Sequence, residues 1–317
     1  MYVLKRTGQS ILVLAGVVTL IFFVLRLVPG DPISVIAPTA SVAVKAELRI
    51  SLGLDLPLWQ QYVVFLQNVV RGDFGQSYFF QGRAIDLVMT ALPYTTALAG
   101  AAILIALLVA VPAGIAAALH ADRTVDRVVL GASLIFQSMP NFWLALLMLS
   151  VVAVKSGLFP TVGYVGPLSL VLPAVTLSIS LIAVLTQVLR NALVECLRSD
   201  MATAMRARGI ALSRILLVHG MRLSAVPLLT VIGVQLGYLL GGAVVIEYIF
   251  NFPGLGLLTL NAVLRRDYPL LQLVVLVTAL IFLVINLLID LSYGLIDGRL
   301  ATRRRASPSS GKPRDAT

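Results

Sequence analysis

Charged residues are scarce in this chain. Asp, Glu, Lys and Arg make up 12% of its 317 residues, whereas 59% belong to the hydrophobic set and the mean hydropathy is +0.99. A soluble domain normally carries about 25% charged residues. The composition therefore excludes a cytosolic enzyme, a disordered chain and a disulfide scaffold, and it indicates a single polytopic membrane domain.

Cysteine and histidine are almost absent. The one cysteine, Cys196, excludes an internal disulfide and a thiolate metal cluster, and the two histidines, His120 and His219, lie far apart in the sequence. The sequence has no G-x-x-x-x-G-K-[ST] motif, so we expect no P-loop nucleotide site. It also lacks Ser-His-Asp and H-E-x-x-H patterns. We therefore predict no catalytic residues, no metal site and no cofactor bound by this chain.

Long uncharged runs predict the membrane-spanning helices. A helix needs about 20 predominantly apolar residues to cross the hydrocarbon core, and alternating strand-like segments of a membrane barrel are missing. Six runs of 19 to 34 residues meet or approach this length. These runs are 7–25, 87–119, 128–154, 156–189, 223–246 and 268–289. The sequence therefore predicts an all-α membrane protein with six transmembrane helices.

The basic residues predict the orientation. With the N-terminus inside, segments 1–8, 119–127, 190–223 and 297–317 are cytoplasmic and hold 16 of the 24 Lys and Arg residues, as the positive-inside rule requires. Both termini are then cytoplasmic. The net charge of +10 follows from membrane sidedness, with anionic-lipid contact as a minor contribution. Since the basic residues form no single face, no nucleic-acid partner is expected.

The first apolar run has a cleaved signal peptide as its alternative, with Lys5 and Arg6 as the charged start. However, its 19 uncharged residues exceed the core of about 7–15 residues that a signal peptide carries. No convincing small-residue cleavage site follows Arg26. A retained first helix is therefore favoured.

A long external segment, residues 29–92, separates the first two predicted spans. Residues 42–53 and 57–71 carry helical periodicity, with Pro57 placed for a first turn and Gly72 just past the end. The segment is predicted to form a small helical cap on the outer face. A solvated connector is the alternative.

A basic cytoplasmic loop, residues 198–222, lies between the fourth and fifth predicted spans. Gly209 can end a helix by adopting a positive φ, and Ser213 suits the N-cap of a second helix. Two short helices bent about a glycine, with exposed apolar and arginine residues, suit docking to a soluble protein. An ordinary basic loop is the alternative.

Glycine and proline mark the predicted spans. Gly233, Gly237 and Gly241 recur every four residues on one face of the fifth span, with Gly242 beside them. This spacing allows close helix packing in lipid and would equally leave space along a translocation path, so both interpretations stay open. Kinks are expected where prolines fall in or near spans, at Pro112, Pro140, Pro173 and Pro227.

Two acidic residues lie at the ends of predicted spans. Asp290, in the last turns of the sixth span, is a functional candidate, although a partnership with an arginine or backbone near the inner interface is preferred. Glu247, at the outer end of the fifth span, has two interpretations. It is either an outer gate that meets a cationic peptide terminus, or an interfacial partner of Arg265 or Arg266.

Short motifs occur in order along almost the whole chain. Examples are LVPGDP at 27–32, GDFGQS at 72–77, SMPNFW at 138–143, FPGLG at 252–256, RDYP at 266–269, NLLID at 286–290 and DGR at 297–299. Together with the loop at 198–222, which is similar to an EAA-type coupling loop, they resemble ABC-importer permeases of the dipeptide, oligopeptide and nickel group.

The resemblance implies a type I ABC importer (MetI-like) fold. Its first helix lies within residues 1–28 and wraps a core of helices 2–6 in residues 93–297. The tail at 298–317 is cytoplasmic, and its Ser, Pro and charged residues predict disorder. The implied partners are a second homologous permease chain, two ABC ATPase subunits, an external substrate-binding protein and the lipid bilayer.

The resemblance also implies roles for individual residues. A groove of one ATPase receives the coupling loop, while residues of the fifth span line the path. The chain departs from the family pattern at Thr203 (usually Glu), Met205 (usually Ala) and Gly298 (usually Pro). The residues implied in coupling are Asp200, Thr203, Ala204, Arg206, Ala207, Gly209 and Ser213.

The predicted function is ATP-driven, binding-protein-dependent import of di- or oligopeptides across the cytoplasmic membrane of a prokaryote. ATP hydrolysis is expected in separate subunits. Nickel, glutathione or another small solute is the alternative within the same architecture. An ATP-independent channel or secondary transporter is the alternative of another class. It predicts inverted repeats with charged midplane sites, and the sequence shows neither.

Overall fold

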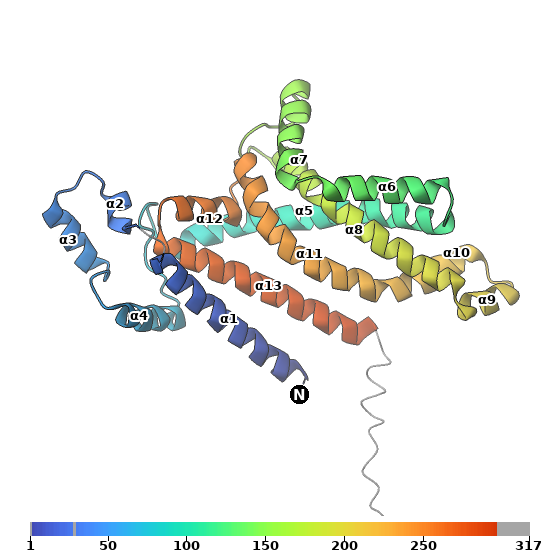
Figure 1. Cartoon of the computed structure of the whole chain (residues 1–317), viewed down its shortest axis with the longest axis horizontal. Helices are drawn as coiled ribbons and strands as arrows, with labels where there is room; N and C mark the ends of the chain where they lie inside the picture. The colour runs from blue at the N-terminus through green and yellow to red at the C-terminus, as the bar shows by residue number, and fades with distance from the viewer. Residues whose placement is uncertain (1, 28–29, 297–317) are drawn as a thin grey trace, which may run out of the picture.

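The computed structural model describes residues 2–27 and 30–296, with side chains in 8–27 and 30–292. The predicted tail at 298–317, including Gly298, lies outside the described residues. The described residues form a bundle of long helices with a helical cap at one end, here called the cap end (Figure 1). The opposite end, called the α9 end, carries two short helices. The start of α1 and the end of α13 also lie away from the cap, short of α9 (Figure 1).

Five helical stretches of the described residues are long and apolar enough to cross a membrane, and a bent pair makes a sixth candidate. The all-α membrane fold is thus confirmed, with five to six spans. The helices that carry the five spans are α1 (Tyr2–Leu27), α5 (Ala84–Leu119), α8 (Val171–Arg198) preceded by the 3₁₀ turn η2 (Pro167–Leu170), α11 (Met221–Ile249) and α13 (Tyr268–Ile296).

The bent pair corresponds to the predicted run 128–154. It consists of α6 (Thr124–Ser138), then α7 (Asn141–Leu147) with the π-helical η1 (Met148–Val154), and the two parts meet at 96°. Pro140 lacks an N–H and restricts the preceding residue to extended backbone. Met139 accordingly has ψ 128°. The kink expected at Pro140 is therefore a sharp bend of 96° between α6 and α7.

Small side chains allow α5 and α8 to pack closely along their length. Alanines spaced by four residues on α5 are buried, and so are leucines with the same spacing on α8. Alternating small and large partners let two helices approach in lipid. Pro173 lies in the first turn of α8, where proline is tolerated. The buried residues are Ala102, Ala106 and Ala110 on α5 and Leu181, Leu185, Leu189 and Leu193 on α8.

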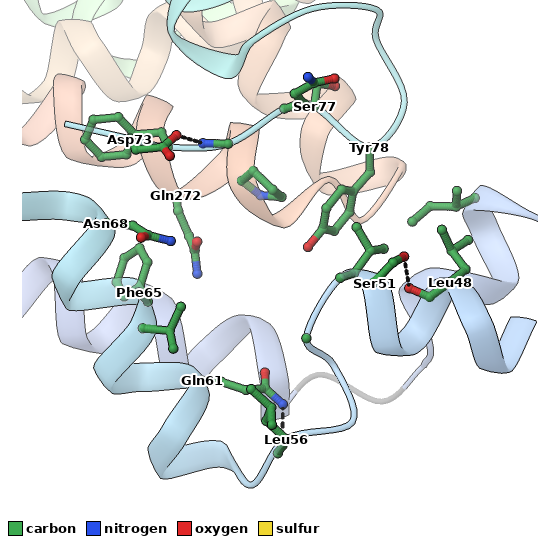
Figure 2. Close-up of a pocket in the computed structure, with 18 of the residues that line it drawn as sticks. Leu48, Ser51, Leu56, Gln61, Phe65, Asn68, Asp73, Ser77, Tyr78 and Gln272 are labelled. Atoms are coloured by element: carbon green, nitrogen blue, oxygen red, sulfur yellow. Dashed lines mark hydrogen bonds between the residues drawn. The ribbon is translucent and has the colours of Figure 1, made fainter. Parts of the chain in front are cut away.

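The segment predicted to be external contains three helices before α5, as the helical-cap prediction required. They are α2 (Pro32–Ile36), α3 (Val42–Ser51) and α4 (Leu58–Arg71). Gly72 ends α4 in the left-handed conformation with φ +71°, as predicted, while Pro57 is the N-cap of α4, one residue before its first turn. Between this cap and the start of α13 lies a pocket of about 550 Å³ (Figure 2).

Two further regions complete the fold. A ten-residue apolar helix, α12 (Leu255–Leu264), lies between α11 and α13 at the cap end (Figure 1). At the α9 end, the chain leaves α8 and forms α9 (Asp200–Ala207), α10 (Leu212–Arg214) and the π-helical η3 (Ile215–Gly220) before entering α11.

Candidate functional site

The loop at the α9 end is a helix, a glycine turn and a second helix. Ser199 caps α9, since its hydroxyl accepts a hydrogen bond from the N–H of Ala202. Gly209 has φ +75°. Its N–H donates to the carbonyl of Arg206 at 2.9 Å, and the N–H of Ile210 donates to that of Met205 at 3.1 Å. These two bonds form a Schellman motif, so the predicted glycine stop at Gly209 is confirmed.

Every residue predicted to act in coupling lies on the surface of this loop. The predicted N-cap role of Ser213 is wrong, because the second helix begins at Leu212 after Ala211 and Ser213 lies inside it. Apolar side chains are also exposed beside the polar ones, including Leu217 at 56% and Val218 at 54%. The exposed predicted residues are Asp200, Thr203, Ala204, Arg206, Ala207, Gly209 and Ser213.

The second half of the loop is continuous with a membrane-spanning helix. Residues 212–249 form one helical stretch in which α10 and η3 lead into α11 without a break. Ile215 and Leu216 of η3 are buried, at 0% and 2% exposure. A Cβ added to Gly220 would lie 2.9 Å from a methyl of Leu193, so η3 lies close against α8. The loop and α11 therefore belong to one continuous helical stretch that packs on α8.

Arg206 has a contact that sequence reasoning did not predict. Its guanidinium donates a hydrogen bond to the backbone carbonyl of Leu197, in the last turn of α8. Cations are favourable at this end of a helix because its carbonyls have no partners within the helix. Arg206 therefore ties α9 back to α8 as well as lying on the exposed surface.

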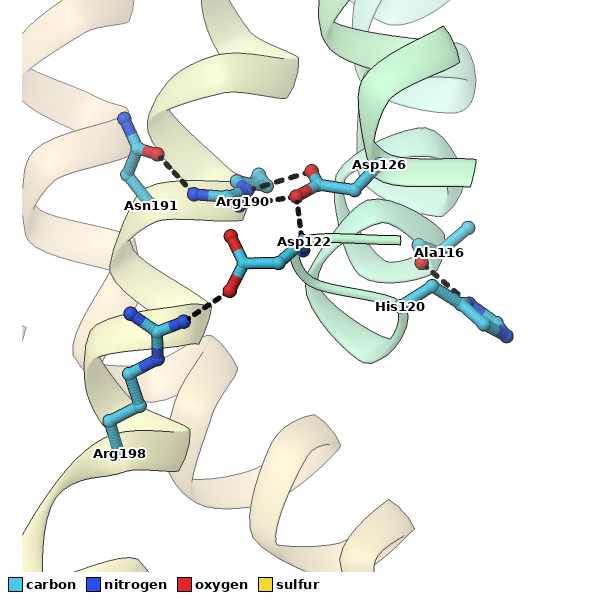
Figure 3. Close-up of polar contacts among 7 residues, drawn as sticks. All are labelled: Ala116, His120, Asp122, Asp126, Arg190, Asn191 and Arg198. Carbon is cyan, nitrogen blue, oxygen red and sulfur yellow. Dashed lines mark hydrogen bonds and ion pairs between the residues drawn. The ribbon is translucent and has the colours of Figure 1, made fainter. Parts of the chain in front are cut away.

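Ion pairs fix the turn between α5 and α6 onto α8 at the same end (Figure 3). Arg190 donates from Nε to Asp126 at 2.9 Å and from a terminal nitrogen to the other carboxylate oxygen, in a pair that is largely buried. Asp126 also accepts from the N–H of Asp122 at 2.8 Å. Arg198 pairs with Asp122 at 2.7 Å in solvent. The bidentate, buried pair gives most of this attachment, since exposed pairs contribute little.

The four glycines of α11 do not share one role. A Cβ on Gly233 would lie 2.9 Å from Ile289, and one on Gly237 would lie 3.1 Å from Phe282, so these two allow α11 to pack against α13. Gly242 faces Asn141 and Leu177 at ordinary contact distances. Space remains open beside Gly241, which lines a cavity of about 450 Å³ among α5, α11, α12 and α13.

Glu247 joins three helices at the cap end and has 0% exposure. Its Oε2 accepts hydrogen bonds from the N–H groups of Gly256 at 2.7 Å and Leu257 at 3.0 Å, and its Oε1 accepts from the hydroxyl of Thr95 at 2.7 Å. The Thr95 hydroxyl in turn accepts from the N–H of Leu255 at 2.8 Å. Glu247 and Thr95 thus satisfy the first three N–H groups of α12, which have no partners within the helix.

Neither interpretation of Glu247 as a gate or an arginine partner agrees with this geometry. The carboxylate is enclosed and accepts from α12 and α5. Arg265 instead lies over the ring of Phe79, 3.5 Å from its centroid, and the guanidinium of Arg266 lies against Gly30. We call the group formed by Glu247, Thr95 and the first turn of α12 the α12 anchor.

Glycine is required beside the α12 anchor. A Cβ on Gly256 would lie 2.5 Å from the backbone Cα of Val244. Gly256→Ala is therefore expected to cost about 1–3 kcal/mol of stability through overpacking and to lower the midpoint of thermal unfolding in detergent by several degrees. Gly241→Ala is the matched control because a Cβ there meets open space. Equal midpoints for the two variants would contradict the packing assignment.

Asp267 connects the cap to the bundle. It has 0% exposure and accepts a hydrogen bond from the hydroxyl of Ser77. As the residue that precedes α13, Asp267 also accepts from the N–H of Leu270 at 3.3 Å. The 72–77 and 266–269 motifs therefore meet in space. Ser77 also accepts from the N–H of Phe80 at 2.8 Å.

Ser77→Ala is expected to lower the free energy of unfolding by about 1–3 kcal/mol, since it leaves a buried carboxylate with one donor fewer. Faster proteolysis of the cap in membrane vesicles would measure the loss. Ser51→Ala, whose exposed hydroxyl bonds only to its own helix at Leu48, provides the control. Cleavage at the same rate in both variants would show that Asp267 does not hold the cap.

Asp290 lines a small pocket of about 250 Å³ between α1 and α13, together with Gln9, Ser10 and Asn286. This places it on the α9 half of α13, facing the first helix. The predicted partnership of Asp290 near the inner interface and its functional role both stay predictions.

Comparisons with known proteins agree with this architecture. The family described as binding-protein-dependent transport system inner membrane component matches residues 110–302, and its N-terminal counterpart matches residues 1–99. A probable peptide ABC transporter permease of Sinorhizobium fredii is 37% identical over 308 residues, covering 94% of this chain and 98% of the relative. The oligopeptide permease AppB of Bacillus subtilis is 33% identical, with coverages of 94% and 98%.

Two more similarities extend the comparison. The glutathione transport system permease GsiC of Escherichia coli is 36% identical, covering 93% of this chain and 97% of the relative. Among solved structures, an inward-facing form of the MetNI methionine ABC transporter superposes with a TM-score of 0.58 at 18% identity, covering 66% of this chain and 96% of the other. That likeness establishes the MetI-type fold.

The family matches and the MetI-type fold thus define a transport permease of the inner membrane. The chain belongs to the binding-protein-dependent transport system inner membrane component family. It is a multi-pass permease component of an ABC importer of that class.

Proposed function

We propose that this chain imports short peptides as one of two homologous permease subunits, coupled to two separate ATPases and supplied by an external binding protein. The observation that carries the proposal is the exposed α9–Gly209–α10 element, which is continuous with α11. Such an element gives a soluble motor subunit a direct connection to the membrane. In this arrangement the α9 end faces the cytoplasm and the cap faces outside.

In the proposed cycle, residues 200–213 insert into a groove of one ATPase. Closure of the ATPases moves α9 and α10, and the continuous helical stretch passes this movement to α11. The space beside Gly241 then becomes part of the path that opens to the outside, while Gly233 and Gly237 keep α11 packed on α13. The chain itself needs no catalytic residue, because ATP hydrolysis takes place in the partner subunits.

Peptides are the proposed solute because the relatives from Sinorhizobium and Bacillus are named as peptide and oligopeptide permeases. The glutathione permease of Escherichia coli favours a second candidate of similar chemistry, since glutathione is itself a tripeptide. The two candidates are distinguished by the ligand that competes for transport. Uptake of labelled glutathione should be inhibited by excess unlabelled peptides for a general peptide importer, and by unlabelled glutathione alone for the second candidate.

The proposal is tested by purifying the tagged chain from its native membrane in mild detergent and identifying the proteins that accompany it. A P-loop ATPase in stoichiometric amount is expected, and its ligand-stimulated hydrolysis should fall about tenfold in Arg206→Glu. Arg71→Glu, a charge reversal on the exposed end of α4, is the control and should leave hydrolysis unchanged. A preparation that transports in liposomes without any ATPase would overturn the proposal and favour a channel or secondary transporter.

A further inference from the structure

The pocket between the cap and α13 has the size of a small-molecule site. Its volume of about 550 Å³ lies within the range of about 300–1,000 Å³ that is usual for such sites. The walls come from α3, α4, the 73–78 loop and the first residues of α13 (Figure 2). The cavity beside Gly241 is a separate space with a different lining.

One buried donor in this pocket has no partner among the residues that the structure describes. Gln272 is only 7% exposed, and its Nε2 has no hydrogen-bond partner among the described residues. Leaving such a donor unpaired is unfavourable. The side chain extends from α13 into the pocket, towards Asn68 and Phe65 of α4 (Figure 2). A molecule in the pocket that offers an acceptor oxygen would satisfy it.

The neighbouring polar groups also favour an acceptor. The guanidinium of Arg26 lines the pocket and is held in place by Gln61, to which its Nε donates at 2.8 Å. Burial raises the pKa of Tyr78 to about 12, despite the opposing effect of Arg26. Its hydroxyl therefore keeps its proton at any physiological pH and can donate. A cation and two neutral donors together suit a carboxylate.

The rest of the lining suits the other parts of a short zwitterion. Asp73, on the 73–78 loop, presents an exposed carboxylate whose Oδ1 accepts from the N–H of Gly75 at 3.0 Å. It supplies an acceptor for an ammonium group. Between the charged groups the walls are apolar, and they are formed by Leu48, Leu52, Leu56, Val64 and Phe65. A lipid tail would leave the buried Gln272 amide without a partner.

We propose that this pocket is a binding site for a small zwitterion with apolar side chains, of the size of a short peptide. Gln272 and Arg26 receive its carboxylate, and Asp73 receives its ammonium group. The site lies in the cap, away from the cavity beside Gly241. This proposal does not depend on the proposed import function. It concerns binding to the chain in the absence of ATP and of partner subunits, whichever solute the importer transports.

Trialanine is the probe for this site, with the full chain in lipid nanodiscs and binding followed by calorimetry. Saturable binding of one trialanine per chain is expected. Gln272→Met keeps the side-chain length but removes the donor, so it should weaken binding about tenfold. Gln67→Met, on the exposed face of α4 outside the pocket lining, should change binding less than twofold. Trialanine amide, which lacks the carboxylate, should bind about tenfold more weakly than trialanine.

The thermal stability of the unliganded variants separates a ligand site from a structural role. Because the Gln272 donor has no partner in the described part of the chain, Gln272→Met should unfold at or above the wild-type temperature without trialanine. It should also lose the stabilisation that trialanine gives the wild type. A lower unfolding temperature with no trialanine binding to the wild type at millimolar concentration would show that Gln272 holds only water. Equal binding by wild type and Gln272→Met would also overturn the proposal.

Discussion

Glu247→Ala is expected to lower the free energy of unfolding by about 3–5 kcal/mol, the cost of breaking a buried charged hydrogen-bond group. The change leaves the N–H groups of Gly256 and Leu257 and the hydroxyl of Thr95 without their acceptor inside the bundle. The protein should accumulate poorly in the membrane, and its thermal midpoint in detergent should fall by more than that of Gly256→Ala.

Two variants make the test of Glu247 specific. Glu247→Gln keeps an oxygen for the α12 N–H groups and can donate its amide to the Thr95 hydroxyl, so about 1 kcal/mol of loss is expected. Glu195→Ala removes an exposed carboxylate from α8 and should have no effect on the midpoint. If Glu247→Ala unfolded at the same temperature as Glu195→Ala, the α12 anchor would not hold α12 to the bundle.

The features that sequence reasoning predicted correctly are local ones. Gly209 and Gly72 end helices because each is followed by a change of chain direction and glycine alone adopts positive φ without strain. The cap helices and the long apolar spans also follow from short-range patterns. A motif read over six residues gives the shape of the backbone at that point. It does not give the partner that the side chain meets across the bundle.

The incorrect and missing predictions are those that depend on distant contacts. The hydroxyl of Thr95 that meets Glu247 lies 152 residues away in sequence, so an acidic residue at a helix end was interpreted as a surface group. The helix α12 has ten residues, too few for a span, and was therefore not predicted. The proline at position 140 predicted a kink, but the size of the bend depends on the packing of α7 against α8 and α11.

The structure connects the loop at the α9 end with the α12 anchor through a single element. Residues 212–249 are one helical stretch that starts beside Gly209 and contains Glu247 two residues before its end. Its middle packs on α13 at Gly233 and Gly237, where α13 lies too close to α11 for a larger side chain. A movement of the loop would therefore act on one end of α11, while the α12 anchor holds its other end and the contacts with α13 restrict its middle. This geometry favours tilting of α11 about the α12 anchor.

Gly209→Val is expected to reduce substrate uptake by about 10- to 100-fold while the chain remains folded in the membrane. Valine at φ +75° costs about 1–2 kcal/mol, enough to break the Schellman bonds from Gly209 and Ile210 and change how α9 meets α10. Uptake of labelled peptide into cells, normalised to the amount of permease in the membrane, measures the effect.

Gly72→Val is the matched control for Gly209→Val. Gly72 also follows a helix, has φ +71° and would place its Cβ in open space, as Gly209 would. The two substitutions therefore introduce the same backbone strain at opposite ends of the molecule. Uptake should stay at the wild-type level in Gly72→Val and fall in Gly209→Val, because only Gly209 lies in the element proposed to meet the ATPase. Equal losses would mean that strain alone accounts for the defect and that the α9 end has no special part in coupling.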